Sequence, residues 1–324
     1  MFNNRSVSEF VLVGFTSITH YHSILFILFF FLYIIITTGN GITFAVIVLN
    51  YRLHTPMYHF IAALSIIEIC IVTTVYPTIF ELFLKGRAYI PFDYCFFQMY
   101  SFDAFLITEN YLLSIMAFDR FVAICKALRY QAIMTLKLCK ILICLCWLLG
   151  LLSPLFMIAM VYQLPFCGPN EIEHLFCDSS PLLSLACANS NLDVTMDLSV
   201  SSFSIILNSI FIVLIYAKIL ATILKMKTSE ERRKAFSTCM SHLFMSLFFY
   251  GSVVFMYINL QSMYSPAYDL AASIHHSVFT PLLSPLVYSF RNKQIKNFLK
   301  KQLHPISLFT WNKKKTQKKI VNLK

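Results

Sequence analysis

Charged side chains are scarce in this chain of 324 residues. Aspartate, glutamate, lysine and arginine together make up 13% of it, whereas soluble domains average about 25%. Glycine occurs only 7 times and tryptophan twice, while hydrophobic residues reach 58% and the mean hydropathy is +0.70. Too few charges remain to cover the surface of a water-soluble domain. The composition therefore predicts a membrane protein.

The sequence contains seven apolar runs near or above the length of a membrane-spanning helix, which is about 20 residues. They cover roughly 23–49, 57–84, 95–125, 138–162, 193–224, 236–260 and 268–290. The third and seventh are the weakest, because each carries polar residues. Long unbroken runs favour helices over barrel strands. We therefore predict an all-α membrane protein, with a seven-transmembrane helix bundle over 23–290.

Lysine and arginine fall mainly on one side of the predicted membrane. Arg5, Lys85 and Arg87 lie on one side, and the other basic residues lie at or near the opposite helix ends. The basic side is cytoplasmic by the positive-inside rule. We therefore expect a multi-pass plasma-membrane protein with residues 1–22 extracellular and 291–324 cytoplasmic. Because the basic residues are dispersed among short loops, they indicate attraction to anionic lipid rather than nucleic-acid binding.

Two features of the chain ends add to this picture. Asn4 begins an Asn-Arg-Ser tripeptide, which matches the glycosylation acceptor pattern and would lie outside. After the seventh run, apolar side chains at one face of 291–303 oppose lysines; they are Ile295, Phe298, Leu299 and Leu303. This spacing predicts a short amphipathic helix on the inner membrane surface, followed by a basic tail.

Four cysteines fall outside or at the outer membrane edge, namely Cys95, Cys167, Cys177 and Cys187. Disulfides are allowed in this oxidising environment. Three of the four lie in the longest loop, about 163–192, and loops of this length are usually functional or disordered. Four cysteines allow three pairings, and their spacing does not choose among them.

Ionisable residues inside a membrane are candidates for function. This chain has few. Five stand out, and the second and third runs hold all five: Glu68, Asp103, Glu109, Asp119 and Arg120. The adjacent Asp119 and Arg120 end the third run at the cytoplasmic face. On these residues alone, anchoring of a helix end is as good an explanation as a functional pair.

The sequence Asp119-Arg120-Phe121 resembles the Asp-Arg-Tyr signature of rhodopsin-like G protein-coupled receptors. Further stretches resemble signatures of vertebrate olfactory receptors, as does the loop with three cysteines. These stretches are LHTPMYHF (53–60), MAFDRFVAIC (116–125), KAFSTCMSHL (234–243) and PLLSPLVYSFRNK (281–293). The resemblance covers nearly the whole chain, from about residue 8 to 303.

The resemblance implies an odorant receptor. It would bind small, mostly apolar volatile molecules in the outer half of the bundle. It would activate a stimulatory, olfactory-type G protein and raise cyclic AMP. The alternative is a receptor of the same family that senses a metabolite outside the olfactory epithelium. A transporter or channel would show repeats or a charged line through the membrane, and an enzyme would show a recognisable catalytic set. The sequence shows neither, so we expect no enzymatic activity.

The resemblance also assigns a switch between ligand and G protein. Arg120 would pair with Asp119 in the resting receptor and meet the G protein when active. Other positions match residues that take part in activation, namely Tyr216, Tyr250, Ser284, Pro285 and Tyr288. Ser284 and Phe121 depart from the usual asparagine and tyrosine, so basal activity is expected to differ.

The predicted pocket lies among the outer halves of four runs. Its residues by analogy are Phe102, Asp103, Leu106, Ile107, Ser201, Ser204, Ile205, Val253, Val254, Tyr257, Ile274 and Ser277. Most are apolar, as expected for volatile ligands. Asp103 would favour a polar or basic odorant.

Disulfides and an ion site follow from the same resemblance. The implied disulfide pairs are Cys95 with Cys177 and Cys167 with Cys187. Related receptors hold sodium beside Glu68, and Glu109, Asn40 and Ser284 would complete an oxygen-rich cavity here. The alternative is that burial keeps one or both carboxyls neutral. We expect no cofactor other than this possible structural sodium ion.

Overall fold

The computed structural model describes most of the chain. The described residues are 7–14, 21–166, 169–187, 191–260, 266–290 and 295–297. Within these ranges, side chains are not described at 191–204, 238, 253–260, 266–268 and 289–290.

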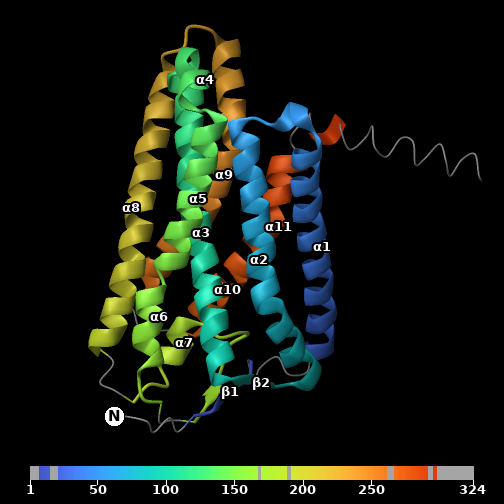
Figure 1. Ribbon diagram of the computed structural model, residues 1–324, viewed down its shortest axis with the longest axis vertical. Helices are drawn as coiled ribbons and strands as arrows, with labels where there is room; N and C mark the ends of the chain where they lie inside the picture. Colours follow the sequence, from blue (N-terminus) through green and yellow to red (C-terminus); the bar gives the residue numbers. More distant parts are fainter. Residues whose placement is uncertain are drawn as a thin grey trace, which may run out of the picture.

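The fold is a bundle of long helices that run side by side (Figure 1). Each predicted run forms helix, which confirms the seven-helix architecture. The helices are α1 (His22–Leu49), α2 (Pro56–Lys85), α3 (Phe92–Cys125), α5 (Leu136–Leu152), α6 (Leu155–Tyr162), α8 (Asn191–Leu224), α9 (Ser229–Leu260), α10 (Pro266–Ile274) and α11 (Thr280–Pro285). The short α4 (Tyr130–Ile133) and α7 (Ser179–Leu183) lie in connecting loops.

Local sequence sets several helix boundaries. Pro56 occupies the first turn of α2, where its missing N–H is not needed. The same helix ends at Gly86, whose φ of 76° is left-handed and favours glycine. At α5, the Thr135 side chain caps the helix by accepting a hydrogen bond from the Leu138 N–H at 3.2 Å.

Two predicted runs are each divided in the structure. The run 138–162 forms α5 and α6, which meet at Ser153 and Pro154, because proline cannot donate the helical hydrogen bond. The run 268–290 forms α10 and α11, with π-helical turns at His275–Phe279 and Leu286–Phe290. The number of spans is unchanged, but two of them are not single regular helices.

By length and composition alone, five of the described helical segments could cross a membrane. They are His22–Leu49, Pro56–Lys85, Leu136–Tyr162, Ile205–Leu224 and Asp269–Tyr288. α3 is absent from this set, as its polar content predicts. The seventh span is long and apolar enough to cross a membrane, although we expected it to be one of the weakest. The described residues of α9 are not apolar enough to be included. α9 opens with the charged sequence SEERRK.

A small sheet at one end of the bundle was not predicted from the sequence. Strand β1 (Glu9–Leu12) pairs antiparallel with β2 (Ala88–Pro91) and parallel with β3 (Glu171–Ile172). Phe10 and Leu12 of β1 are fully buried. The sheet therefore ties the amino-terminal segment to both the α2–α3 connection and the long loop.

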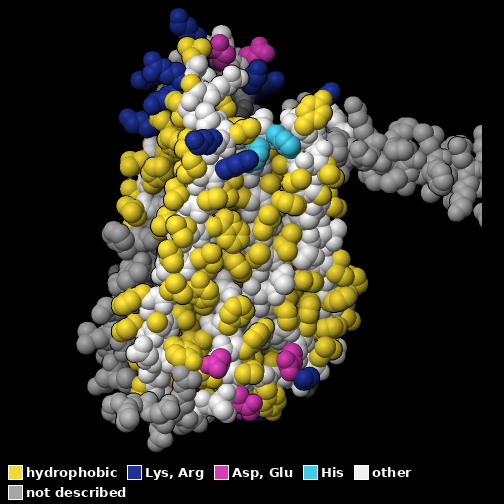
Figure 2. Space-filling model, in the orientation of Figure 1, with side chains coloured by type: hydrophobic (Ala, Val, Ile, Leu, Met, Phe, Trp, Pro, Cys, Tyr) yellow, Lys and Arg dark blue, Asp and Glu magenta, His cyan; other side chains and the backbone are white. Residues whose placement is uncertain are grey.

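The two ends of the bundle differ in charge (Figure 2). Lysine and arginine gather at the end that holds α4, while hydrophobic side chains cover the middle of the visible face. We call this the basic end, and we call the opposite end, which carries the sheet, the disulfide end. Between them α3 packs against α2, α5, α8 and α9, so it forms the centre of the bundle.

The predicted amphipathic helix lies largely outside the described residues. Within it only 295–297 is described; this segment is helical, with Ile295 buried and Lys296 and Asn297 exposed. That pattern agrees with the predicted apolar face at the one turn where it can be seen.

Candidate functional site

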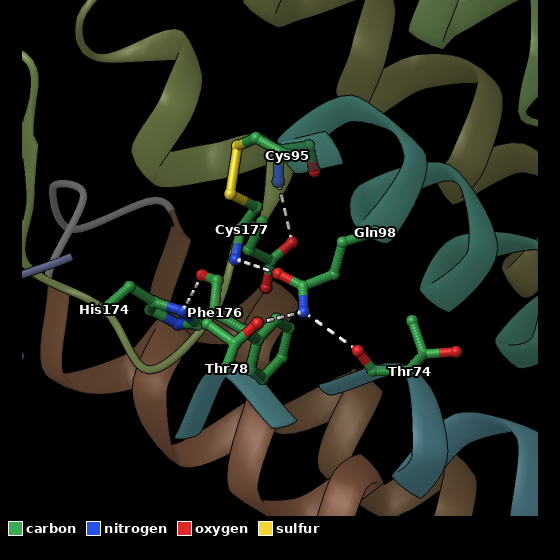
Figure 3. Close-up of a disulfide and its surroundings, with 9 residues drawn as sticks. Thr74, Thr78, Cys95, Gln98, His174, Phe176 and Cys177 are labelled. Atoms are coloured by element: carbon green, nitrogen blue, oxygen red, sulfur yellow. Dashed lines mark hydrogen bonds between the residues drawn. A yellow bond between two sulfur atoms is a disulfide. The ribbon is translucent and has the colours of Figure 1, made fainter. Parts of the chain in front are cut away.

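The disulfide end is closed by a bond between Cys95, in the first turn of α3, and Cys177 of the long loop (Figure 3). Their Cα atoms are 5.4 Å apart. This is the pairing that the family resemblance implies. Cys187 is disulfide-bonded as well, whereas Cys167 and Asn4 lie outside the described residues.

Gln98 is a site residue that sequence reasoning missed. Its Nε2 donates to the Thr74 carbonyl at 2.9 Å and to the Thr78 hydroxyl at 2.8 Å. Its Oε1 accepts from the Cys177 N–H at 3.0 Å. One buried side chain thus joins α2, α3 and the loop beside the disulfide (Figure 3). The available signal was its position one turn after Cys95.

The structure describes the side chains of only some of the predicted pocket-wall residues. Phe102 is buried beneath the loop, and its ring centroid lies 4.8 Å from that of Phe176. Phe176 of the loop, which sequence reasoning missed, thus packs on this predicted wall residue, and we call it the roof of the predicted pocket. Ser277 is buried and donates to the Ser273 carbonyl at 2.6 Å.

Other predicted wall residues are partly buried: Asp103, Leu106, Ile107, Ile205 and Ile274. The remaining five have side chains outside the described part of the chain: Ser201, Ser204, Val253, Val254 and Tyr257.

At the basic end, Asp119 and Arg120 form a buried ion pair. The Arg120 Nε donates to Asp119 Oδ2 at 3.1 Å, and its terminal nitrogen donates to the same oxygen. Tyr130 of α4, which was not predicted, donates from its hydroxyl to Asp119 Oδ1 at 2.8 Å. Burial, and then the Asp119 carboxylate, raise the pKa of Tyr130 above its ordinary value. The hydroxyl therefore stays protonated, and Asp119 is held from two sides.

His242 of α9 contacts both α3 and α8 in the interior of the bundle. Its Nε2 lies 3.1 Å from the Leu113 carbonyl of α3. Its Nδ1 meets the Tyr216 hydroxyl of α8 and lies 3.4 Å from the Ser246 hydroxyl. A neutral ring protonated on Nε2 donates to the Leu113 carbonyl and accepts on Nδ1 from the nearer hydroxyl, that of Tyr216. Tyr216 was predicted, whereas His242 was missed although it stands in KAFSTCMSHL.

Tyr250 of α9 donates to the Asn110 side-chain oxygen of α3. The predicted switch residues of the seventh span, Ser284, Pro285 and Tyr288, are all buried. The Tyr288 hydroxyl makes no hydrogen bond with the described residues. These predicted switch residues therefore lie inside the bundle, but the Tyr288 hydroxyl is not hydrogen-bonded to any of them.

Glu68 and Glu109 are buried close enough to interact electrostatically. Among the described residues, neither oxygen of Glu68 has a hydrogen-bond partner, and neither does Oε2 of Glu109. Asn40 and Ser284 lie near Glu68 without completing a hydrogen bond to it. No cluster of three or more histidine, cysteine, aspartate or glutamate side chains in the described part of the chain could hold a metal. Glu68 and Glu109 thus form a buried pair in which three of the four carboxyl oxygens lack a hydrogen-bond partner among the described residues.

A seven-helix bundle that is closed by a disulfide-linked loop at one end and holds a buried Asp-Arg pair at the other has the architecture of a G protein-coupled receptor. Residues 29–305 match the family model described as olfactory receptor. The chain therefore belongs to the olfactory receptor family.

Individual receptors match over nearly their whole length. The chain is 40% identical to human Olfactory receptor 6N1 over 306 residues, which are 94% of this chain and 98% of that protein. It is 39% identical to human Olfactory receptor 6K2 over 309 residues, 95% of each. It is 37% identical to mouse Olfactory receptor 8U3 over 301 residues, 93% of this chain and 94% of that protein. The protein is thus a multi-pass membrane receptor for odorants that acts through a G protein, and not an enzyme.

Proposed function

We propose that an odorant binds beneath Phe176 and that the bound receptor activates a stimulatory, olfactory-type G protein, which raises cyclic AMP. The observation that carries this proposal is the set of buried contacts along α9. Tyr250 meets Asn110 near the pocket, and His242 meets Tyr216 and α3 nearer the basic end. A movement of α9 would therefore change contacts near the proposed pocket and also contacts nearer the Asp119–Arg120 pair.

The odorant would act by shifting a population. It would bind the active conformer better than the resting one, and only this difference moves the equilibrium. In the active conformer Arg120 would leave Asp119 and meet a helix of the G protein in a groove at the basic end. The closed pair and its Tyr130 contact support assignment of this structure to the resting state.

Substitution of Arg120 by alanine tests this coupling. Cells expressing Arg120→Ala are expected to lose odorant-evoked cyclic AMP while surface expression stays at the wild-type level. The control is Arg52→Ala, which removes an exposed arginine from the α1–α2 connection. A preserved response in Arg120→Ala at equal surface expression would refute the proposed role.

The disulfide end is proposed to face outward and the basic end the cytoplasm. The positive-inside rule and the oxidising environment that disulfides require both support this orientation. An epitope placed before residue 7 should be stained by antibody on intact cells, and one placed after residue 324 only after permeabilisation. The reverse pattern would overturn the orientation.

The described pocket wall is mainly apolar, which supports a small volatile ligand held chiefly by burial. Asp103 is the exception on α3, and we propose that it selects odorants with a basic or hydrogen-bond-donating group. Responses of wild type and Asp103→Asn are to be compared across amines, alcohols and esters. An unchanged ranking of these three classes would eliminate Asp103 as a selector.

Glu68 and Glu109 are proposed to hold a sodium ion together with the side-chain oxygens of Asn40 and Ser284. Unpaired buried acceptors on three of these residues support this fit, because hard cations prefer oxygen ligands. Bound sodium would supply positive charge that lets both carboxyls stay ionised. The purified receptor should then have a higher apparent melting temperature in sodium chloride than in choline chloride. Equal melting temperatures and equal ligand responses would favour neutral carboxyls instead.

A further inference from the structure

His174 is a buried residue of the long loop, next to Phe176 and the disulfide (Figure 3). Its Nδ1 is 3.0 Å from the Phe176 carbonyl. Its Nε2 is 3.3 Å from the Ser273 hydroxyl of α10. That hydroxyl donates to Asp178 Oδ2 at 3.0 Å. The other Asp178 oxygen accepts from the Ser179 N–H at 2.8 Å and caps α7.

Counting the protons in this chain of contacts leads to one charge state. A carbonyl and an ionised carboxylate can only accept hydrogen bonds. Ser273 has one hydroxyl proton, and the Asp178 carboxylate takes it. The Ser273 oxygen must then accept from Nε2–H, while Nδ1 must donate to the Phe176 carbonyl. Both ring nitrogens carry protons only in the imidazolium, so with a neutral ring one of the three hydrogen bonds in this chain would be lost.

An alternative place for the extra proton is Asp178. A protonated carboxyl could donate to Ser273, which would then donate to a neutral His174. An aspartate carboxyl ordinarily holds a proton far more weakly than an imidazole does. We therefore place the second proton on the His174 ring.

We propose that His174 is a positioning residue that, as the imidazolium, fastens the pocket roof to α10 and makes the roof sensitive to the external proton concentration. Phe176, whose carbonyl it binds, packs on Phe102 of the pocket wall. Loss of the proton breaks one of three contacts: His174 with Phe176, His174 with Ser273, or Ser273 with Asp178. The effect on odorant binding rests on the proposed function, whereas the charge state itself does not.

The titratable groups on the surrounding elements are mainly acidic. The loop carries Asp178 and the exposed Glu171 and Glu173, and α3 carries Asp103 beside Phe102. α10 carries Asp269 and is followed by His275 and His276. On α2, the residues nearest the disulfide network are the uncharged Thr74 and Thr78.

Two neighbouring contacts do not depend on the His174 proton. The Arg87 guanidinium, on the sheet side of the loop, is paired with Glu171 at 2.9 Å. Asp269 accepts from the Ser180 hydroxyl at 2.8 Å, which provides a second tie between loop and α10. Deprotonation is therefore expected to loosen the roof rather than detach the loop.

Asp178→Asn separates this proposal from a merely structural role. The asparagine oxygen can still cap α7 while its NH₂ donates to Ser273. Ser273 can then donate to His174 Nε2, and a neutral ring keeps both contacts. The variant should fold with the same contacts and no longer need the second ring proton.

The full-length receptor in detergent, labelled with ¹⁵N-histidine, gives the direct readout by nuclear magnetic resonance. The His174 signals are those absent from His174→Gln. At pH 6.5 we expect two protonated ring nitrogens in wild type and one bare nitrogen in Asp178→Asn. If Asp178→Asn does not fold, Ser273→Ala should show the bare nitrogen instead. A bare nitrogen in wild type, or two protonated nitrogens in the folded variant, overturns the proposal.

Thermal stability gives a second readout. A folded state that holds a proton absent from the unfolded state loses stability as pH rises. Between pH 6 and pH 8 the apparent melting temperature of wild type should therefore fall relative to Asp178→Asn, by about 2–4 °C. If the melting temperatures of wild type and Asp178→Asn changed with pH in parallel, the proposed role of the His174 imidazolium would be contradicted. Neither readout uses an odorant, so failure of the proposed receptor function and failure of the proposed role of His174 are distinguishable.

Discussion

Gly150 lies where α5 crosses α3, and the helices approach there more closely than any side chain at 150 would allow. A Cβ at this position would stand 1.9 Å from Thr108 Oγ1 and 2.9 Å from both the Ala104 carbonyl oxygen and Thr108 Cα. The Thr108 hydroxyl can rotate, although it now donates to Ala104 at 2.7 Å. The two backbone atoms cannot rotate away. We therefore expect Gly150→Ala to force the helices apart.

The size of the effect follows from these distances. Normal carbon contacts need about 3.5 Å, so the helices must separate by roughly half an ångström. Overpacking of this kind costs about 1–3 kcal/mol, whereas replacing glycine by alanine inside a helix returns at most about 1 kcal/mol. With the full gain subtracted, the net loss in the free energy of unfolding is up to about 2 kcal/mol. For a chain of this size that corresponds to about 4 °C in the melting temperature.

The matched control is Gly41→Ala in α1, because no heavy atom lies within 4 Å of a Cβ there. The apparent melting temperatures of both variants are to be measured on purified receptor with a thiol-reactive dye. Adding Thr108→Ala to Gly150→Ala should restore part of the loss, since only the closest contact is removed. Equal melting temperatures for Gly150→Ala and Gly41→Ala would refute the close-packing argument.

Three further substitutions test contacts at the two ends. Gln98→Leu leaves the buried Cys177 N–H without its acceptor and should destabilise the receptor by about 1–3 kcal/mol, seen as a lower melting temperature. Tyr130→Phe removes one hydrogen bond to Asp119 and should raise ligand-free cyclic AMP severalfold, because a bond to a charged group contributes about 1.5–3 kcal/mol to the resting state. Arg87→Ala removes a half-exposed ion pair and should change the melting temperature by less than about 2 °C.

Each of these has its own control. Gln131→Leu makes the same replacement at an exposed position and should leave the melting temperature unchanged. Tyr51→Phe removes a hydroxyl from the exposed α1–α2 connection and should leave basal cyclic AMP unchanged. Wild-type stability in Gln98→Leu, or wild-type basal signal in Tyr130→Phe, would contradict the assigned contact. A large loss in Arg87→Ala would show that the pair is shielded from solvent.

The helices could be predicted because each corresponds to a run of apolar residues in the sequence that is long enough to cross a bilayer. The small sheet has no comparable pattern in the sequence, since β1 has four residues and β3 has two. Its strands depend on pairing between distant segments. The break at Pro154 was visible as a proline, but a spanning run gives no measure of how a helix bends there.

The candidate site, too, could be predicted from the sequence only in part. Asp119 and Arg120 are adjacent, so their pairing could be expected from the motif. Gln98 and His242 act through partners on other elements, and their types alone do not distinguish them from ordinary packing residues. Hydrogen bonds that join distant parts of the chain become predictable only once the helices are placed side by side.

The position of β1 has a consequence for the order in which the receptor is made. β1 is synthesised before any span, yet β2 follows the second span and β3 follows the fourth. Until those spans are inserted, Phe10 and Leu12 have no sheet to bury them. Pairing between distant segments is also slow to form. The amino-terminal strand therefore settles late in biogenesis. We expect a nascent receptor that stalls before its fourth span to lack β3 and to expose an apolar segment to folding chaperones.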